Sequence, residues 1–378
     1  MNRLKAARKA RDWSQDRLVV EFERRRLGSG QPSPKRASLK TYISEWENNR
    51  RPVGGNDRAT LRAIFGLTDA ELFGPSDAST TLDEAYVELA ERIDSAKSVD
   101  PGMICVLTNQ TELFRAMDRQ MGAPALADPM AAHIGTLENA LAYAVLSSVR
   151  RPIARALSSA ATLGGWQALD VGAVDRAWRH YELARRAARE AENLALRSHA
   201  MAEQAYVLID AGKPLLAQEL IGEAVSAARG HVPARLIAWL HAAEAEIAAS
   251  SGCESRARNS IDLALTALPE GVEMRDPEVP GVFLNHAHLN RWRGNVLAML
   301  GETEAIDALH AALAEHDGTF TRAEAPLRVN LAQAYFAQGD LSQAVYQARR
   351  ARSLVIRTGS LRIKRRLDHL TTRLLDRA

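Results

Sequence analysis

The segment "LAQAYFAQGDLSQAVYQARRA", residues 331–351, indicates how most of this 378-residue chain is expected to fold. Small residues stand at fixed distances from Gly339, with Ala332 seven positions before it, Ala344 five after it and Ala351 twelve after it. A glycine of this kind marks a turn, and small side chains on both sides of a turn let two helices approach closely. The segment therefore predicts a hairpin of two packed helices.

The same spacing recurs four more times upstream, which makes the hairpin a repeat. The five marker glycines are Gly172, Gly212, Gly252, Gly301 and Gly339. Seven residues before them stand Gly165, Ala205, Ala245, Gly294 and Ala332. Five residues after them stand Ala177, Ala217, Ala257 and Ala344, with Ala305 one position early in the fourth unit. Larger side chains follow at nine positions after the markers, namely Tyr181, Ile221, Ile261 and, with the same one-residue shift, Leu309.

This pattern resembles a tetratricopeptide array, although its period is longer than that family's usual length of about 34 residues. The resemblance implies an all-α fold in which residues 159–378 form an α-solenoid of stacked helical hairpins with a concave groove. The final segment, "LRIKRRLDHLTTRLLDRA", is expected to be a capping helix with a basic face. Residues 82–158 are helical in pattern but out of phase, and they are either a degenerate leading repeat or a connector.

A column of larger side chains is expected to face the groove. Six residues before each marker glycine stand Trp166, Tyr206, Glu246, Asn295 and Gln333. Neighbouring inward positions hold His199, Trp239, His288 and Arg291. Amide side chains pair well with a peptide backbone, so the column is a candidate site for an extended peptide, a small molecule or a partner protein. The alternative is that these side chains satisfy one another or contact water.

The N-terminal part of the chain, 1–74, differs from the rest in charge. It contains 16 Lys and Arg against 9 Asp and Glu, whereas the remainder contains 33 against 37. A basic N-terminal domain followed by a mildly acidic body favours a nucleic-acid partner for the first part. The polar stretch at 75–81 is expected to link the two parts.

Three helical patterns lie in this basic domain. Ser14 is a candidate N-cap for "SQDRLVVEFERRRL". Ser38 is expected to open a second helix, in which Leu39, Ile43 and Trp46 point inward at helical spacing. Between these two, residues 28–36, "GSGQPSPKR", are rich in glycine and proline and predict a loop, and "LRAIFGLTDAELFG" predicts the closing helices.

"WSQDRL" followed by "YISEWENNRRP" resembles the helix-turn-helix of the phage repressor and Cro type, the XRE family. The resemblance implies that Lys40, Thr41 and Ser44 face base edges of double-stranded DNA. It further implies phosphate or base contacts from the residues around that helix, namely Gln15, Lys35, Arg36, Asn49, Arg50 and Arg51. One departure is the long loop before the reading helix, where the family has a tight turn.

No motif for an enzyme is found. Phosphate loops, dinucleotide fingerprints and zinc patterns are missing from the sequence, and His286 and His288 have a poor spacing for a shared metal on a helix. We therefore expect no catalytic activity and no cofactor. The apolar runs are too short for a membrane span, and the two cysteines fit a reducing cytoplasm.

The repeat body adds a second resemblance, carried by "GGWQALDVGAVDRAWRHYELARRAARE" and "LTNQTELFRAMDRQMG". Both resemble a set of actinobacterial regulators that join a helix-turn-helix to a tetratricopeptide domain. This implies a cytoplasmic, homodimeric transcriptional regulator that senses a peptide, small-molecule or protein effector. The alternative from another class is an interaction scaffold whose helix-turn-helix does not read DNA.

Overall fold

A computed structural model shows two compact units, Met1–Glu91 and Arg92–Ala378. The structure describes residues 2–28, 34–73, 78–97, 99–270, 275–276, 278–316, 318 and 320–376. Most of these lie in helices, as the repeat pattern predicts. They also include one short two-stranded sheet, which an all-α prediction does not contain.

The first unit contains five short helices around one core. They are α1 (Arg3–Ala10), α2 (Gln15–Gly28), α3 (Arg36–Glu47), α4 (Gly55–Phe65) and α5 (Asp69–Phe73). Ser14 caps α2 as predicted, since its Oγ accepts a hydrogen bond from the backbone N–H of Arg17. The predicted inward residues Leu39, Ile43 and Trp46 are buried in this core.

The predicted start of the helix at Ser38, which is α3 in the structure, is wrong. Helix α3 begins at Arg36, two residues before Ser38, and the Lys35 side chain makes no capping bond. Ser38 is therefore inside the first turn of the helix, and the predicted loop shortens at its C-terminal end. Residues 29–33 of that loop lie outside the described part of the chain.

Helix α6 (Ala78–Lys97) spans the division between the two units, so the second half of the predicted 75–81 linker is helical. The first half, 75–77, lies outside the described residues. Beyond α6 lie α7 (Pro101–Met121), a short 3₁₀ turn (Pro124–Leu126) and α8 (Ala127–Tyr143). Both α7 and α8 pack mainly on α9, the helix that follows α8, and make fewer contacts with each other. The two helices of a repeat hairpin would instead pack on each other. That next helix, α9, begins at Ser147 and so crosses the predicted boundary at 158.

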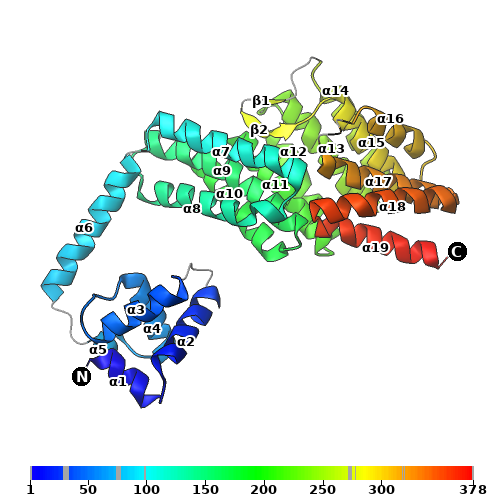
Figure 1. Ribbon diagram of the computed structural model, residues 1–378. Helices are drawn as coiled ribbons and strands as arrows, with labels where there is room; N and C mark the ends of the chain where they lie inside the picture. The colour runs from blue at the N-terminus through cyan, green and yellow to red at the C-terminus, as the bar shows by residue number, and fades with distance from the viewer. Residues whose placement is uncertain are drawn as a thin grey trace. The chain divides into compact units, whose positions relative to one another are not determined.

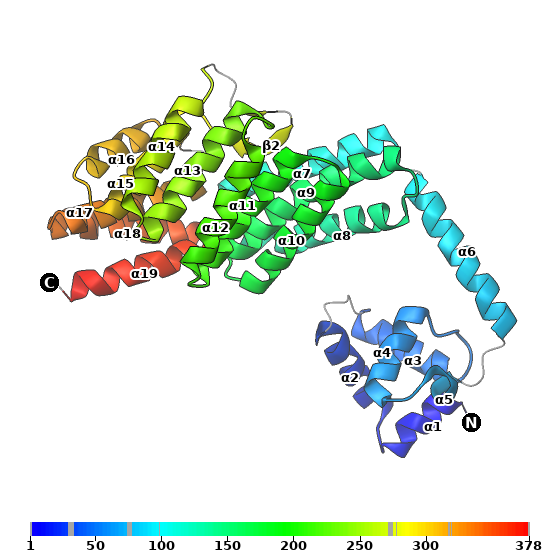
Figure 2. The ribbon, with the colours of Figure 1, turned by 180° about the vertical axis from the view of Figure 1, so that it is seen from behind.

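Five helical hairpins follow one another along the second unit (Figures 1 and 2). They are α9 (Ser147–Asp170) with α10 (Val174–Glu190), α11 (Leu194–Asp210) with α12 (Pro214–Ala228), α13 (Ala234–Ser250) with α14 (Glu254–Ala267), α15 (His286–Leu300) with α16 (Ala305–Ala314), and α17 (Thr321–Ala337) with α18 (Leu341–Thr358). The predicted capping helix is α19 (Leu361–Leu375).

The repeat register agrees with burial and with backbone geometry. Each marker glycine lies in the turn between the two helices of a hairpin and has a positive φ, which disfavours other residues. The alanines at the predicted small positions are buried between helices. A Cβ atom on Gly165 would lie only 2.7 Å from the Tyr181 ring, so the small residue and the large one fit together.

An insertion lengthens the spacing between the third and fourth hairpins. It contains β1 (Arg275–Asp276) and β2 (Val279–Phe283), which pair in an antiparallel sheet with an irregular register. Strand β2 contacts α9, α11 and α13, the first helices of the first three hairpins. The insertion therefore returns to the inner side of the solenoid.

The last helices also contact the first ones. Helix α17 packs on α7, and α19 packs on α9, although these elements lie near opposite ends of the second unit in sequence. Ser360, just before α19, donates a hydrogen bond of 2.6 Å to the Asp170 carboxylate at the end of α9. These contacts join the two ends of the solenoid and narrow its concave side to a cavity that remains partly open to solvent.

Candidate functional site

The exposed face of α3 is the candidate DNA interface. Lys40 and Thr41 are exposed and Ser44 is half-buried, on the side of the helix away from the core residues. Arg50 and Arg51 follow the helix and are exposed. The arrangement presents polar and basic side chains on a helix whose other side is held by the core.

Several of the predicted DNA contacts are engaged within the unit. The Lys40 Nζ atom lies 2.7 Å from an Asp16 carboxylate oxygen. Gln15 donates a hydrogen bond of 2.8 Å to Glu47, which turns its amide toward the core rather than outward. The remaining contacts pair Arg36 with Glu23 at 3.9 Å, Arg51 with Glu45 at 3.6 Å, Asn49 with the Asn2 side chain, and the Thr41 hydroxyl with the Ala37 carbonyl.

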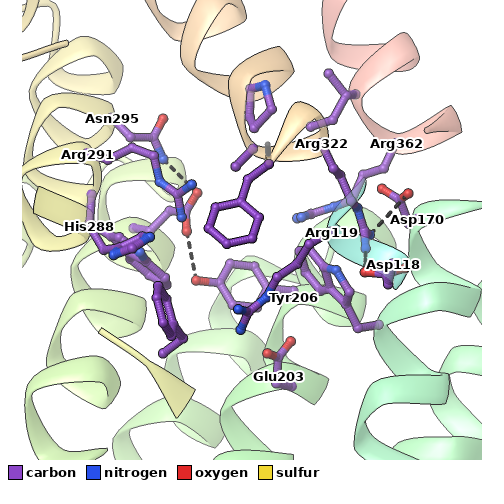
Figure 3. Close-up of a pocket in the computed structure, with 18 of the residues that line it drawn as sticks. Asp118, Arg119, Asp170, Glu203, Tyr206, His288, Arg291, Asn295, Arg322 and Arg362 are labelled. Atoms are coloured by element: carbon purple, nitrogen blue, oxygen red, sulfur yellow. Dashed lines mark hydrogen bonds and ion pairs between the residues drawn. The ribbon is translucent and has the colours of Figure 1, made fainter. Parts of the chain in front are cut away.

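The second candidate site is the cavity inside the closed solenoid, with a volume of about 340 Å³ (Figure 3). Its walls come from α7, α9, α11, α13, α15, α17, α19 and strand β2. Eight of the nine predicted groove residues line it: Trp166, His199, Tyr206, Trp239, Glu246, His288, Arg291 and Asn295.

Gln333 is the exception, because it does not border the cavity. The lining residues from α17 lie between Arg322 and Asn330 and include Pro326 and Leu327. Asn330 precedes Gln333 by three positions, about one helical turn, so the two share a face at different heights. The cavity therefore ends along α17 before it reaches Gln333.

Part of the column satisfies itself, as the alternative interpretation expects. Glu246 accepts a hydrogen bond of 2.7 Å from the Tyr206 hydroxyl and another of 2.7 Å from the Asn295 amide. These bonds join α11, α13 and α15 across the inner face. The three residues therefore have a structural role, since their hydrogen bonds connect these helices.

Sequence reasoning missed most of the charged residues of the cavity. Arg322 of α17 pairs with Asp118 of α7 and lies 3.1 Å from Asp170 of α9. Burial raises the pKa of the Asp170 carboxyl to about 6, which still leaves it ionised at neutral pH and paired with Arg322. A repeat pattern carries no signal for such pairs, because they join the two ends of the solenoid.

The basic face predicted for the capping helix turns partly into this cavity. Arg362 of α19 holds Asp210 at 2.8 Å, and Arg366 donates a hydrogen bond of 2.7 Å to Asn330. The Arg322 and Arg362 guanidinium carbons lie 5.3 Å and 5.6 Å from the Trp166 ring centre, at distances where cation–π attraction applies. The capping helix therefore supplies charge to the site as well as covering the end of the solenoid.

His288 lies at one end of the cavity, where its surroundings change the pKa of its imidazole. Burial lowers its pKa to about 4, and the positive charges of Arg291, Arg119 and His316 add to this effect. Its Nδ1 atom is 2.6 Å from the Asn285 side-chain oxygen. At neutral pH the imidazole is uncharged, next to a concentration of positive charge.

We expect this histidine to make stability fall on acidification. The folded-state pKa lies below the unfolded value of 6.5, so the contribution is fully present above pH 6.5 and is lost as the pH falls toward 4. The loss is about 1 kcal/mol per pH unit in that window. Urea unfolding of the native chain and of His288→Asn, followed from pH 7 to 4, measures it as a difference in slope. Equal slopes would contradict the assignment.

The described residues contain neither a metal-binding cluster nor a membrane-spanning helix. No group of three or more His, Cys, Asp and Glu side chains is placed to hold a metal ion. Within the same residues, no helix is long and apolar enough to cross a bilayer.

Comparisons with known proteins leave the family open. No protein-family model matches the chain, and no curated protein matches it. A chain described as BtubC (BKLC) from P. vanneervenii is similar in structure at 18% identity, with a TM-score of 0.43, over 63% of this chain and 90% of that one. A tetratricopeptide repeat protein from Parabacteroides merdae is similar at 14% identity, with a TM-score of 0.38, over 75% and 98%. Both likenesses are distant, and the repeat assignment depends on the hairpins themselves.

Proposed function

We propose that this protein is a DNA-binding regulator that responds to an effector bound in the cavity of its repeat unit. The observation that carries the DNA-binding part is the two-sided character of α3. Leu39, Ile43 and Trp46 are buried while Lys40 and Thr41 are exposed, which is what a helix that enters the major groove requires. Two arginines follow at its end and supply charge for phosphates.

The regulatory part of the proposal uses the closed solenoid. A ligand in the cavity contacts helices from both ends of the chain's second unit, so it biases how tightly the ends are held together. In a homodimer, such a change alters the separation of the two reading helices, which DNA requires to be about one helical turn or a multiple of it.

Binding selection on genomic DNA fragments, followed by gel-shift titration on the recovered site, tests this function. We expect Lys40→Ala to weaken binding about 10-fold and to reduce discrimination between sequences, because a base contact is worth about 1–3 kcal/mol. Arg50→Ala is expected to weaken binding to all sequences and to lower the salt slope by about one. Lys9→Ala, an exposed cation on α1, is the control and should leave both quantities unchanged.

A second candidate is favoured by one observation. Asp16 neutralises Lys40, and Gln15 is held by Glu47, so part of the expected reading face is occupied within the unit. This fits an interaction scaffold whose first unit does not read sequence. Binding that is equally weak for all fragments, and unaltered in Lys40→Ala, would support the scaffold and exclude the regulator.

A further inference from the structure

Arg291 differs from the other arginines of the cavity in having no hydrogen-bond or ion-pair partner among the described residues. Its side chain is half-buried on α15 and borders the cavity (Figure 3). Across the ranges that the structure describes, its guanidinium makes no hydrogen bond and no ion pair. The partners of the other arginines include Asp118 and Asp170 for Arg322, Asp210 for Arg362, Asn330 for Arg366 and Glu112 for Arg115.

The carboxylates of the cavity are already engaged elsewhere. Asp118 and Asp170 pair with Arg322 at the far side, and Glu246 accepts hydrogen bonds from Tyr206 and Asn295. Glu203, the fourth carboxylate of the lining, accepts a hydrogen bond of 3.4 Å from the Tyr181 hydroxyl and lies 3.7 Å from the His199 imidazole. Glu246 attracts Arg291 through its charge but forms no bond with it among the described contacts. The guanidinium donors of Arg291 are thus left at the cavity wall for an acceptor that the described chain does not provide.

A second observation places other positively charged groups near the same end. His288 precedes Arg291 by about one helical turn, and both Arg291 and Arg119 oppose its protonation. The Arg119 guanidinium lies over the Phe283 ring, 4.5 Å from its centre. An anionic group at this end would be attracted by the charges of Arg291 and Arg119 and would lie beside an uncharged imidazole.

Aromatic rings adjoin this charged end. The Phe283 ring centre lies 4.6 Å from that of His288 and 6.5 Å from that of Phe320, in edge-on arrangements. Both phenylalanines line the cavity, and Phe283 reaches it because strand β2 returns to the inner side of the solenoid. A planar ring next to an anion therefore finds apolar aromatic neighbours.

We propose that the cavity binds a small aromatic acid, with its anionic oxygens on the Arg291 guanidinium and its ring beside Phe283 and Phe320. The planar fork of arginine matches two oxygens of a carboxylate or phosphate. The cavity volume is at the lower end of the range that small-molecule sites occupy. This inference rests on the proposed function, in which the cavity is the effector site, and it names the class of effector.

Calorimetric titration of the full chain with 2-naphthoate and with its neutral counterpart 2-naphthamide tests the charge requirement. We expect the acid to bind at least about 10-fold more tightly, because hydrogen bonds to an ionised acceptor are about twice as strong as those between neutral groups. Arg291→Gln is expected to abolish this preference. Arg293→Gln removes an exposed arginine from the same helix and should preserve it. A parallel titration with 2-naphthyl phosphate shows which anion the fork prefers.

The melting temperature of Arg291→Gln distinguishes the loss of a ligand contact from a folding defect. Because the mutation removes a half-buried charge without a partner, we expect an equal or higher melting temperature without ligand, together with weaker acid binding. Equal affinity for acid and amide, or an acid affinity unchanged by Arg291→Gln, would overturn the proposal. DNA binding in the ligand-free gel shift is a separate measurement, so its failure rejects the regulator and leaves the aromatic-acid site to be judged by calorimetry alone.

Discussion

Replacing Gly165 by valine is expected to lower the free energy of unfolding of the repeat unit by about 3 kcal/mol. A Cβ atom at this position would lie 2.7 to 2.9 Å from three atoms of the Tyr181 ring. That ring is fully buried, so it cannot move aside without displacing its own neighbours. Urea unfolding followed by circular dichroism measures the loss.

Gly135→Val is the matched control for this prediction. Gly135 also lies inside a helix, α8, but a Cβ atom there would meet nothing within 4 Å. We expect a change of about 0.5 kcal/mol or less, since valine has a somewhat better helix propensity than glycine. In a Tyr181→Leu background the cost of Gly165→Val should shrink, because the two sites are coupled by contact. A similar loss in both valine variants would refute the close-approach explanation.

Glu47→Ala is expected to destabilise the first unit by about 3–5 kcal/mol, because it leaves a buried guanidinium without a counter-charge. Glu47 is fully buried and accepts two hydrogen bonds from Arg8, at 2.5 and 2.9 Å, and one from Gln15. Burial by itself would raise the pKa of Glu47, but these hydrogen bonds outweigh it and lower the pKa. The carboxylate is therefore the ionised centre that joins α1, α2 and α3.

Hydrogen exchange measured by mass spectrometry tests whether the destabilisation by Glu47→Ala is confined to the first unit. Exchange in residues 2–73 should accelerate strongly in Glu47→Ala, while exchange in the helical hairpins stays unchanged. Glu45→Ala, which removes a more exposed partner of Arg51 on the same helix, should cost no more than about 1 kcal/mol. If the two variants behaved alike, the buried pair would not have the role assigned to it.

Much of the fold follows from local spacing. The glycines at 172, 212, 252, 301 and 339 do lie in hairpin turns, because a positive φ and a tight turn are properties of a few consecutive residues. The inward column was predictable for the same reason, since helical periodicity places Trp166, Tyr206, Glu246 and Asn295 on one face. The insertion at β1 and β2 escaped prediction because its place depends on helices far away in the chain.

The candidate site was predictable only in part. Periodicity identified residues on the inner faces of α9, α11, α13 and α15, but it gave no reason to add Asp118, Arg322 or Arg362. Those side chains reach the cavity because α7, α17 and α19 close it, and the sequence pattern treated α7 as part of a connector and α19 as a cap. The prediction for Gln333 was wrong because register alone does not show where the cavity ends. Gln333 has the same register as the column, but it lies beyond the part of α17 that borders the cavity.

Local sequence was enough to set the helical hairpins, their turns, the small residues between them and the basic character of the first domain. All of these depend on spacing over a few turns of helix or on composition. Long-range packing was needed to join the ends of the solenoid, to narrow its groove to a small cavity, and to leave Arg291 without a partner among the described residues. These outcomes depend on contacts such as that between Arg322 and Asp118, which lie 204 positions apart in the chain. Such residues meet only because the whole solenoid curves far enough to bring its ends together.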